Sequence, residues 1–282
     1  SQLPKTTFKE KMKGFLSFFF PKNLYYRIST SNLDSIYRKN QDDKLIKILK
    51  KKGKGFYLSF KFRPSNNDSN YGQEKNLVGL LETDSNYTIL HQVVHDNRQE
   101  LFEKMYLHLS YLSEKEVLNN NNNALQLSPL HLACCLNNEF FLDGLVQIGA
   151  DHKSFALGGM SLIHVAAYTG SVNCLNYCIA QLGFNVNSKT QDKLTPLHLA
   201  CKFGRIDAVS LLIDSLAHIY ERDEEGLTPL EYSVLGDNNQ LMKILLEHHY
   251  DLERLYKGSP SDKVVKLIHL AATVKSGVKC LT

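Results

Sequence analysis

The chain has 282 residues, of which 43% are hydrophobic and 22% charged, and its formal net charge at pH 7 is +4. This length and apolar content suit one or two globular domains with a sizeable core. No apolar run reaches the roughly 18 residues that a membrane-spanning helix needs. The longest run, residues 14–20, is followed by Pro21 and Lys22 without a small-residue cleavage site, so it does not resemble a secretory signal.

Charge divides the chain unevenly. Residues 1–63 contain 16 Lys and Arg against 4 Asp and Glu, a net charge of +12, whereas the rest of the chain carries −8. Aromatic residues accompany the basic ones, and this combination could bind an anionic membrane surface. The alternative is a solvated basic face whose aromatic side chains lie in a local core. No nucleic-acid-binding motif accompanies the charge, so a nucleic-acid partner is not expected.

Residues 1–80 predict a small basic, aromatic accessory domain of α+β type. Residues 56–62 alternate in the manner of a strand and are rich in aromatic side chains. Residues 44–50 fit either a strand or a short helix, and residues 51–55 would form a hairpin turn between the two segments. Residues 64–72, rich in Asn, Ser and Asp, predict a loop.

Residues 81–282 are organised by a repeat of about 33 residues. Related strings that begin with Ser or Thr occur at residues 128–133, 161–167, 195–200 and 228–233, and their fourth residues are 33, 34 and 33 positions apart. This period, with the pattern Thr-Pro-Leu-His-x-Ala, resembles the ankyrin family, in which a turn and two helices make one repeat. The expected fold class is mainly α: an ankyrin-repeat solenoid preceded by the small α+β domain.

Each residue of the repeated string has a structural role. Thr195 can cap the amino end of a helix, Pro196 fits the first helical position, and His198 can bond back to the cap. Gly204 would end this first helix in the left-handed conformation, and residues 208–213 would supply the apolar face of a second helix. The structural residues of the four strings are Ser128, Pro129, His131, Ser161, His164, Thr195, Pro196, His198, Thr228 and Pro229.

Two weaker repeats flank these four, which makes about six in all. Residues 87–94 predict a degenerate first opening, and the polar tract 119–123 predicts a surface loop before the next one. Residues 266–272 open a last repeat after a lengthened hairpin at 258–262. Residues 278–282 only begin its second helix and lack a polar cap, which solenoid ends need. We therefore expect this chain to be an amino-terminal fragment of a longer protein, with a frayed terminus as the alternative.

The residue types that often carry chemistry are explained by structure. Cys134 and Cys201 follow the Leu-Ala of a repeat and are expected to be buried, and Cys174 and Cys178 lack a second pair at zinc spacing. The sequence thus predicts neither a metal nor a cofactor, and free thiols favour a reducing cytoplasm. Ser161 follows a Gly-x pair but lacks the second glycine of a nucleophile elbow. No catalytic residue is expected in this chain.

A finer resemblance involves a family of enzymes. The order of a basic aromatic segment, a β-containing segment and ankyrin repeats is similar to the amino-terminal half of group VI calcium-independent phospholipase A₂, as are residues 194–204 and 208–212 in detail. That resemblance implies a regulatory ankyrin region whose patatin-like lipase domain, with its Ser–Asp dyad, would lie beyond this chain. No catalytic residue can be carried over to these positions. Residues 235–246 also resemble repeats of ankyrin-type transient receptor potential channels.

The function expected from the repeats is protein binding through the concave face of the solenoid, because repeat stacks offer extended binding surfaces. We expect a cytoplasmic protein, which becomes a peripheral membrane protein if residues 1–63 bind lipid. The oligomeric state is left open by the sequence. The candidate contact residues lie at hairpin tips and near the end of a first helix, and they are Asp192, Lys193, Lys202, Phe203, Arg205, Asp223, Glu224 and Glu225.

Overall fold

The structure is a computed structural model that describes residues 35–52, 88–112, 115–121, 126–236 and 238–247. The chain divides into two compact units, Ser1–Gly53 and Lys54–Thr282. The expected strand at 56–62, the loop at 64–72 and the last repeat from residue 258 onward lie outside the described residues. The domain boundary at residue 80 stays a prediction.

The described part of the first unit contains helix α3, Asp42–Lys52. This helix decides the ambiguity at residues 44–50, because Leu45, Ile46 and Leu49 are buried at helical spacing. The hairpin turn expected at 51–55 is wrong at its start, since Lys51 and Lys52 continue the helix. Among the described residues there is no β-strand, so the α+β character expected for residues 1–80 gains no support.

The second unit is a series of helix pairs. Its first pair is α6 and α7, the degenerate repeat, and the short helix α8 precedes the polar tract at 119–123. Four further pairs follow at the positions of the four repeated strings. The bounds are α6 Ile89–His95, α7 Gln99–Leu112, α8 Lys115–Leu118, α9 Pro129–Cys135, α10 Glu139–Gln147, α11 Leu162–Thr169, α12 Val172–Ala180, α13 Pro196–Lys202, α14 Ile206–Asp214, α15 Pro229–Leu235 and α16 Asn239–Glu247.

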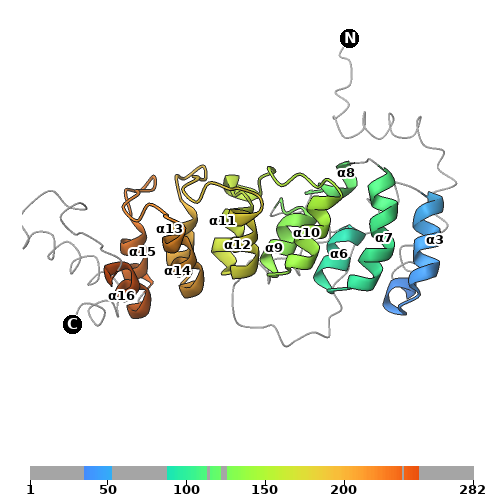
Figure 1. The fold of residues 1–282 in the computed structure, drawn as a ribbon, viewed down its shortest axis with the longest axis horizontal. Helices are drawn as coiled ribbons and strands as arrows, with labels where there is room; N and C mark the ends of the chain where they lie inside the picture. Colours follow the sequence, from blue (N-terminus) through green and yellow to red (C-terminus); the bar gives the residue numbers. More distant parts are fainter. Residues whose placement is uncertain (1–34, 53–87, 113–114, 122–125, 237, 248–282) are drawn as a thin grey trace, which may run out of the picture. The chain divides into compact units, whose positions relative to one another are not determined.

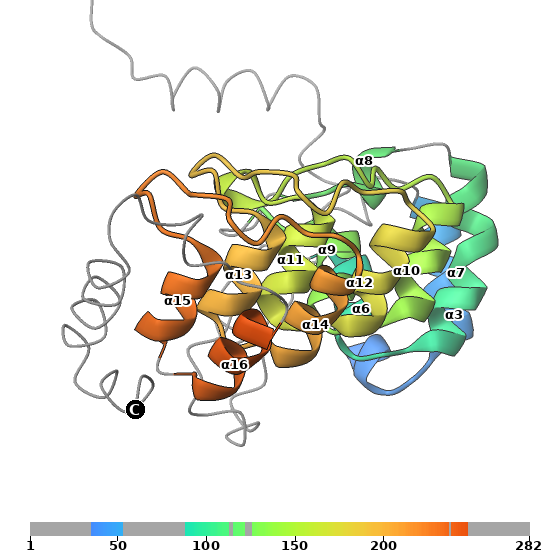
Figure 2. The same ribbon diagram turned by 60° about the vertical axis from the view of Figure 1, so that its left-hand side comes forward.

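Within this unit the helices form two layers. The first helices of successive pairs, α6, α9, α11, α13 and α15, pack side by side, and each packs on the second helix of its own pair. The second helices α10, α12, α14 and α16 form the other layer (Figures 1 and 2). Small residues let the first helices approach, because Ala133, Ala166 and Ala200 are fully buried there. The predicted mainly α repeat architecture is confirmed.

The repeat openings have the capping geometry expected from their sequence. At α13 the Thr195 hydroxyl accepts a hydrogen bond from the His198 N–H, and the Thr195 N–H donates to Nδ1 of the His198 ring over 3.1 Å. The same reciprocal arrangement opens α9 and α15, and at α6 and α11 the N–H of the Thr or Ser likewise donates to Nδ1 of the histidine. Because orphan N–H groups find partners at these helix starts, a side-chain cap stabilises an opening by about 1 kcal/mol.

The remaining local predictions are confirmed in most details. Gly204 adopts a φ of 68° directly after the first helix ends, in the left-handed region. On the second helix α14, Ala208, Val209 and Leu212 are buried as expected, whereas Leu211 and Ile213 are half-buried. The difference arises because an apolar stripe on a helix covers only the positions spaced three and four apart.

Candidate functional site

The connections between repeats end in three tight turns with one backbone plan. A backbone N–H at the start of each turn donates to the carbonyl four residues on, from Ala156 to Met160 over 2.8 Å, from Thr190 to Leu194 over 3.0 Å and from Asp223 to Leu227 over 3.0 Å. We name residues 155–160, 190–194 and 223–227 the first, second and third tip loops. The turn geometry holds the intervening side chains away from the helices.

Adjacent tip loops are joined by backbone hydrogen bonds. The Gln191 N–H donates to the Gly158 carbonyl over 3.3 Å, and the Glu224 N–H donates to the Asp192 carbonyl over 3.0 Å. In Figures 1 and 2 the loops between repeats gather along one edge of the helix layers. The three tip loops therefore form a continuous row rather than three separate turns.

The side chains of the tip loops differ in character from one loop to the next. In the first, Phe155 is 60% exposed and Leu157 is 47% exposed. The candidate residues Asp192 and Lys193 are exposed on the second loop, and Glu224 and Glu225 are exposed on the third. The predicted exposure of these four candidates is thus correct, while their role in binding stays a prediction.

Asp223 was expected at an exposed tip, but it is buried, and this expectation of exposure is wrong. One of its carboxylate oxygens accepts from the Leu227 N–H over 2.8 Å and the other accepts from the Tyr232 hydroxyl over 2.7 Å. Burial, together with the hydrogen bond to Asp223, raises the pKa of Tyr232, so the phenol stays protonated and keeps donating. Asp223 therefore shapes the third tip loop from within.

The other three candidates, Lys202, Phe203 and Arg205, lie where α13 ends. Phe203 is 37% exposed, and its ring centroid is 4.1 Å from that of Tyr168 on α11. Arg205 is half-buried, and its Nε donates to the Tyr168 carbonyl over 3.1 Å. Exposed Lys202 places its Nζ 4.9 Å from the centroid of the Tyr232 ring, within the range of a cation–π contact. Arg205 thus links two repeats, and Phe203 and Lys202 each contact a tyrosine of an adjacent repeat while they remain partly exposed.

Phe155, Leu157 and Tyr168 were not among the predicted site residues. The signal for the first two was present, because apolar Leu157 stands where the next two loops have Gln191 and Glu224, and Phe155 stands where they have Lys189 and Arg222. They were missed because apolar side chains are expected to be buried. Tyr168 carried no such signal, since its position on α11 continues an apolar helix.

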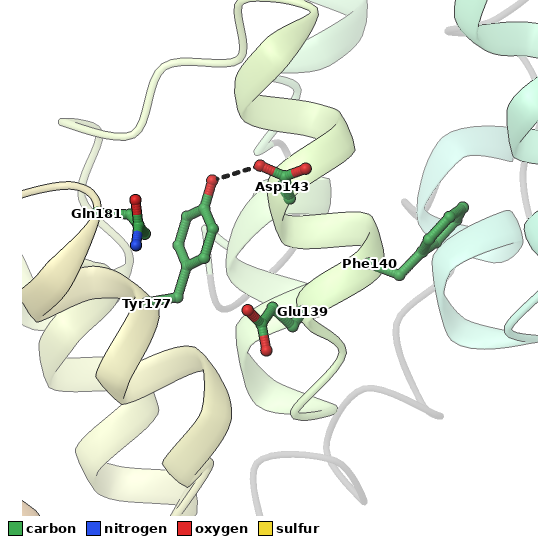
Figure 3. A pocket seen from close by; sticks show the side chains of 5 residues that line it. All are labelled: Glu139, Phe140, Asp143, Tyr177 and Gln181. Atoms are coloured by element: carbon green, nitrogen blue, oxygen red, sulfur yellow. Dashed lines mark hydrogen bonds between the residues drawn. The ribbon is translucent and has the colours of Figure 1, made fainter.

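An open hollow of about 540 Å³ lies on the second-helix layer, between α10 and α12. Figure 3 shows the Tyr177 ring between Gln181 and the α10 carboxylates, with the Phe140 ring pointing away from it. The Tyr177 hydroxyl donates to Asp143 over 2.7 Å, and the Gln147 amide donates to the other oxygen of that carboxylate over 2.6 Å. Both oxygens of Asp143 are therefore already engaged within the protein.

Among the described residues, the cysteines and the histidines of the repeat openings are buried. Contact with Cys174 and Cys178, and then burial, raise the pKa of Cys134, and burial raises the pKa of Cys135 to about 12. Burial lowers the pKa of both His131 and His164 to about 4. Neutral thiols and neutral imidazoles in these positions fill and cap helices, as their place in the repeat predicts.

Comparison with known protein families identifies the repeats. The family model for ankyrin repeats, in three copies, matches residues 159–255. The chain contains ankyrin repeats. Within the described residues, no helix of this chain is both long and apolar enough to cross a bilayer.

Several known ankyrin-containing proteins are similar to parts of this chain. Alpha-latrotoxin-Lhe1a of Latrodectus hesperus is 45% identical over 80 residues, which is 28% of this chain and 6% of the toxin. A transient receptor potential cation channel subfamily A member 1 homolog of Caenorhabditis elegans is 34% identical over 98 residues, or 34% of this chain and 8% of the channel. The B-cell lymphoma 3 protein homolog of Mus musculus is 30% identical over 158 residues, or 54% of this chain and 35% of that protein.

These matches cover 35% or less of each relative named, so they concern the repeats and not the whole proteins. The ankyrin repeats form a protein–protein interaction module. None of the three relatives is a phospholipase, and the resemblance to phospholipase A₂ stays a prediction.

Proposed function

We propose that this ankyrin module binds a protein partner through the concave face, which the tip loops and the first helices build. The observation that carries the proposal is the exposure of Phe155 and Leu157 on the first tip loop. Exposed aromatic and aliphatic side chains held on a rigid turn are the kind of group that supplies binding energy at protein interfaces. Phe203, exposed at the end of α13, adds a third such group.

The rigidity of the tip row supports the same proposal. The hydrogen bonds between adjacent tip loops hold the backbone that carries the exposed side chains in place before a partner arrives. Preorganised contact groups lose less conformational entropy on binding, so more of their contact energy appears as affinity. The buried starts of the first helices, which follow the tip loops in the sequence, fix the spacing between successive loops.

Affinity capture with matched variants tests this proposal. The full chain, a Phe155→Ser variant and a Leu107→Ser variant would each be immobilised. The proteins that each of the three retains would then be identified and their amounts compared. Leu107 is 66% exposed on the second helix α7, so it controls for the loss of any exposed apolar side chain. The proposal predicts a protein that is lost with Phe155→Ser and kept with Leu107→Ser. If every retained protein binds the two variants equally, the tip loops are not the binding face.

A second candidate function, peripheral association with an anionic membrane, is supported by the net charge of +12 in residues 1–63. Basic side chains near an anionic surface each contribute about 1 kcal/mol of attraction. Vesicles containing phosphatidylserine should then sediment the full chain at low salt and leave a chain of residues 81–282 in the supernatant. Equal recovery of both chains in the supernatant would end this candidate.

The alternative is that this chain is the regulatory ankyrin region of a calcium-independent phospholipase A₂. Its support is the likeness of residues 194–204 and 208–212 to a repeat of that enzyme. The coding sequence downstream of Thr282 tests it, because a Gly-x-Ser-x-Gly elbow and a glycine-rich oxyanion loop must follow. A downstream sequence without either motif would remove the enzyme from consideration.

A further inference from the structure

The tip row changes from apolar to acidic along its length. The first loop exposes Phe155 and Leu157, whereas the third exposes Glu224 and Glu225. The second loop carries both signs of charge, because Asp192 and Lys193 are adjacent and exposed. A surface that is apolar at one end and acidic at the other favours a partner whose own two ends are apolar and basic in the same order.

The two exposed carboxylates of the third loop take no part in an ion pair within the part of the chain that the structure describes, although Lys202 lies over the ring of Tyr232, whose pKa is raised by burial and also by the charge of Glu225. Neither Glu224 nor Glu225 forms an ion pair with another described residue. The nearby Glu221 differs, since Lys189 lies 2.6 Å from its carboxylate and lowers its pKa. Arg222 is also committed, because its guanidinium donates to the Gly226 carbonyl and lies 3.8 Å from the carboxylate of Glu231. The two exposed carboxylates therefore face solvent as a local excess of negative charge.

We infer, on the basis of the proposed function, that the partner presents an extended segment with an apolar side chain at one end and basic side chains at the other. The apolar residue lies on Phe155 and Leu157, and the basic residues face Glu224 and Glu225. An acidic or phosphorylated segment would meet like charge at the third loop, which is unfavourable. The inference thus excludes an anionic ligand at this surface.

The spacing within the partner segment follows from the packing of the repeats. Packed helices lie about 8–10 Å apart, so loops two repeats apart are separated by about 16–20 Å. An extended chain advances about 3.3 Å per residue. The basic residues should therefore follow or precede the apolar residue by about five or six positions. The middle of the segment lies over the mixed second loop and carries no charge requirement.

Synthetic peptides test this inference without knowledge of the natural partner. The binding peptide has Trp at one end, an uncharged Gly-Ser spacer, and two Arg residues about six positions away; its reversed sequence is the second probe. A third peptide has Glu in place of both Arg residues, and a fourth has Ser in place of Trp. Fluorescence anisotropy would measure the binding of each labelled peptide to the full chain at low and at physiological salt.

Two double variants, each of which removes two exposed carboxylates, serve as the test and its control. Glu224→Gln with Glu225→Gln should weaken the binding of a Trp–Arg peptide by about three- to tenfold, because each exposed charge pair contributes modestly. Glu100→Gln with Glu103→Gln removes the same charge from α7, whose Glu100 and Glu103 are also exposed, and should change binding by less than about twofold. Phe155→Ser should weaken the Trp–Arg peptide but leave the weak binding of the Ser–Arg peptide unchanged.

The inference is overturned if the Glu peptide binds as well as the Arg peptides, if the two double variants act equally, or if no peptide binds. These outcomes are separable from a failure of the proposed function. When Phe155→Ser still loses its captured protein while the charge variants have no effect, the binding face stands and only the partner chemistry is wrong. When neither capture nor peptide binding depends on the tip loops, both ideas fall.

Discussion

The repeat openings and the tip loops recur with the same period, but the openings keep the same kind of side chain whereas the tip loops vary theirs. In four openings a side-chain oxygen of Ser or Thr lies 2.8 Å from Nδ1 of the histidine three residues on. The tip loops share backbone bonds just as regular, yet their exposed side chains change from apolar to acidic. The comparison teaches that burial constrains side chains at the openings, whereas the turn constrains only the backbone and leaves side chains free to set specificity.

One opening differs in its side chain and shows what the site requires. In α15 the position of the histidine is taken by Glu231, whose carboxylate accepts from the Thr228 N–H over 2.7 Å and from the Thr228 hydroxyl over 2.8 Å. The α15 opening and the four histidine openings all have a capping hydroxyl and a hydrogen-bond acceptor three residues later. A carboxylate can therefore take the place of the imidazole at this position.

The largest expected effect comes from the buried side of an opening. Leu197→Ala should lower the free energy of unfolding by about 2–5 kcal/mol, because Leu197 is fully buried between repeats and its truncation leaves a cavity. Urea denaturation followed by circular dichroism would measure the loss. Leu216→Ala is the matched control, since Leu216 is 82% exposed and should cost less than about 0.5 kcal/mol. Equal losses in the two variants would contradict the assigned packing.

The second effect concerns acid. Burial lowers the pKa of His131 and His164 to about 4, below the unfolded value of 6.5. The unfolded chain therefore binds these protons first, so the stability present above pH 6.5 is lost as pH falls toward 4. Each histidine should remove about 1 kcal/mol per pH unit in this window.

A double variant isolates that contribution. His131→Gln with His164→Gln keeps an uncharged acceptor at both openings and removes both titrations. Urea denaturation at pH 7.5, 6.0 and 5.0 should show a shallower decline in stability for this variant than for the unmodified chain. Parallel declines would show that other groups govern the acid sensitivity.

The third effect is the loss of a single cap. Thr195→Ala should lower the free energy of unfolding by about 1 kcal/mol, because the His198 N–H loses its acceptor. Thr195→Ser retains the hydroxyl and should recover most of the difference. Thermal unfolding of the three proteins would measure both values, and an alanine variant as stable as the serine variant would mean that the hydroxyl does not cap.

The openings could be predicted from the sequence because local signals agree there. The cap, the Pro at the first helical position and the apolar spacing all indicate one helix start, and Gly204 marks the end. Residues 44–50 could not be decided, since a short apolar run fits both periods. Their helix became evident only from the burial of Leu45 and Leu49.

The tip loops were predictable in position but not in the environment of each side chain. Asp223 begins an acidic turn that looks exposed, yet its burial depends on Tyr232, nine residues later. The exposure of Phe155 and Leu157 runs against their polarity. Such details depend on three-dimensional packing, which a periodic pattern does not encode.

The smallest effect tests the regularity of the tip loops themselves. Lys193 adopts a φ of 60° where the matching positions of the other two loops are Gly159 and Gly226. A non-glycine residue in the left-handed region costs about 1 kcal/mol or more, but glycine also gains entropy in the unfolded chain. Lys193→Gly should therefore raise the free energy of unfolding by up to about 1 kcal/mol, measured by urea denaturation.

The control for this substitution is Lys193→Ala, which removes the same charge and side chain but keeps the Cβ atom in the left-handed region. Alanine should give none of the gain, so the difference between the two variants measures the relief of backbone strain minus the entropy that glycine adds to the unfolded chain. A glycine variant no more stable than the alanine variant would show that the strain at residue 193 does not exceed the entropy cost of glycine. In that case the glycines of the first and third loops would add no net stability to their turns, and the three loops would share a backbone shape for reasons of packing instead.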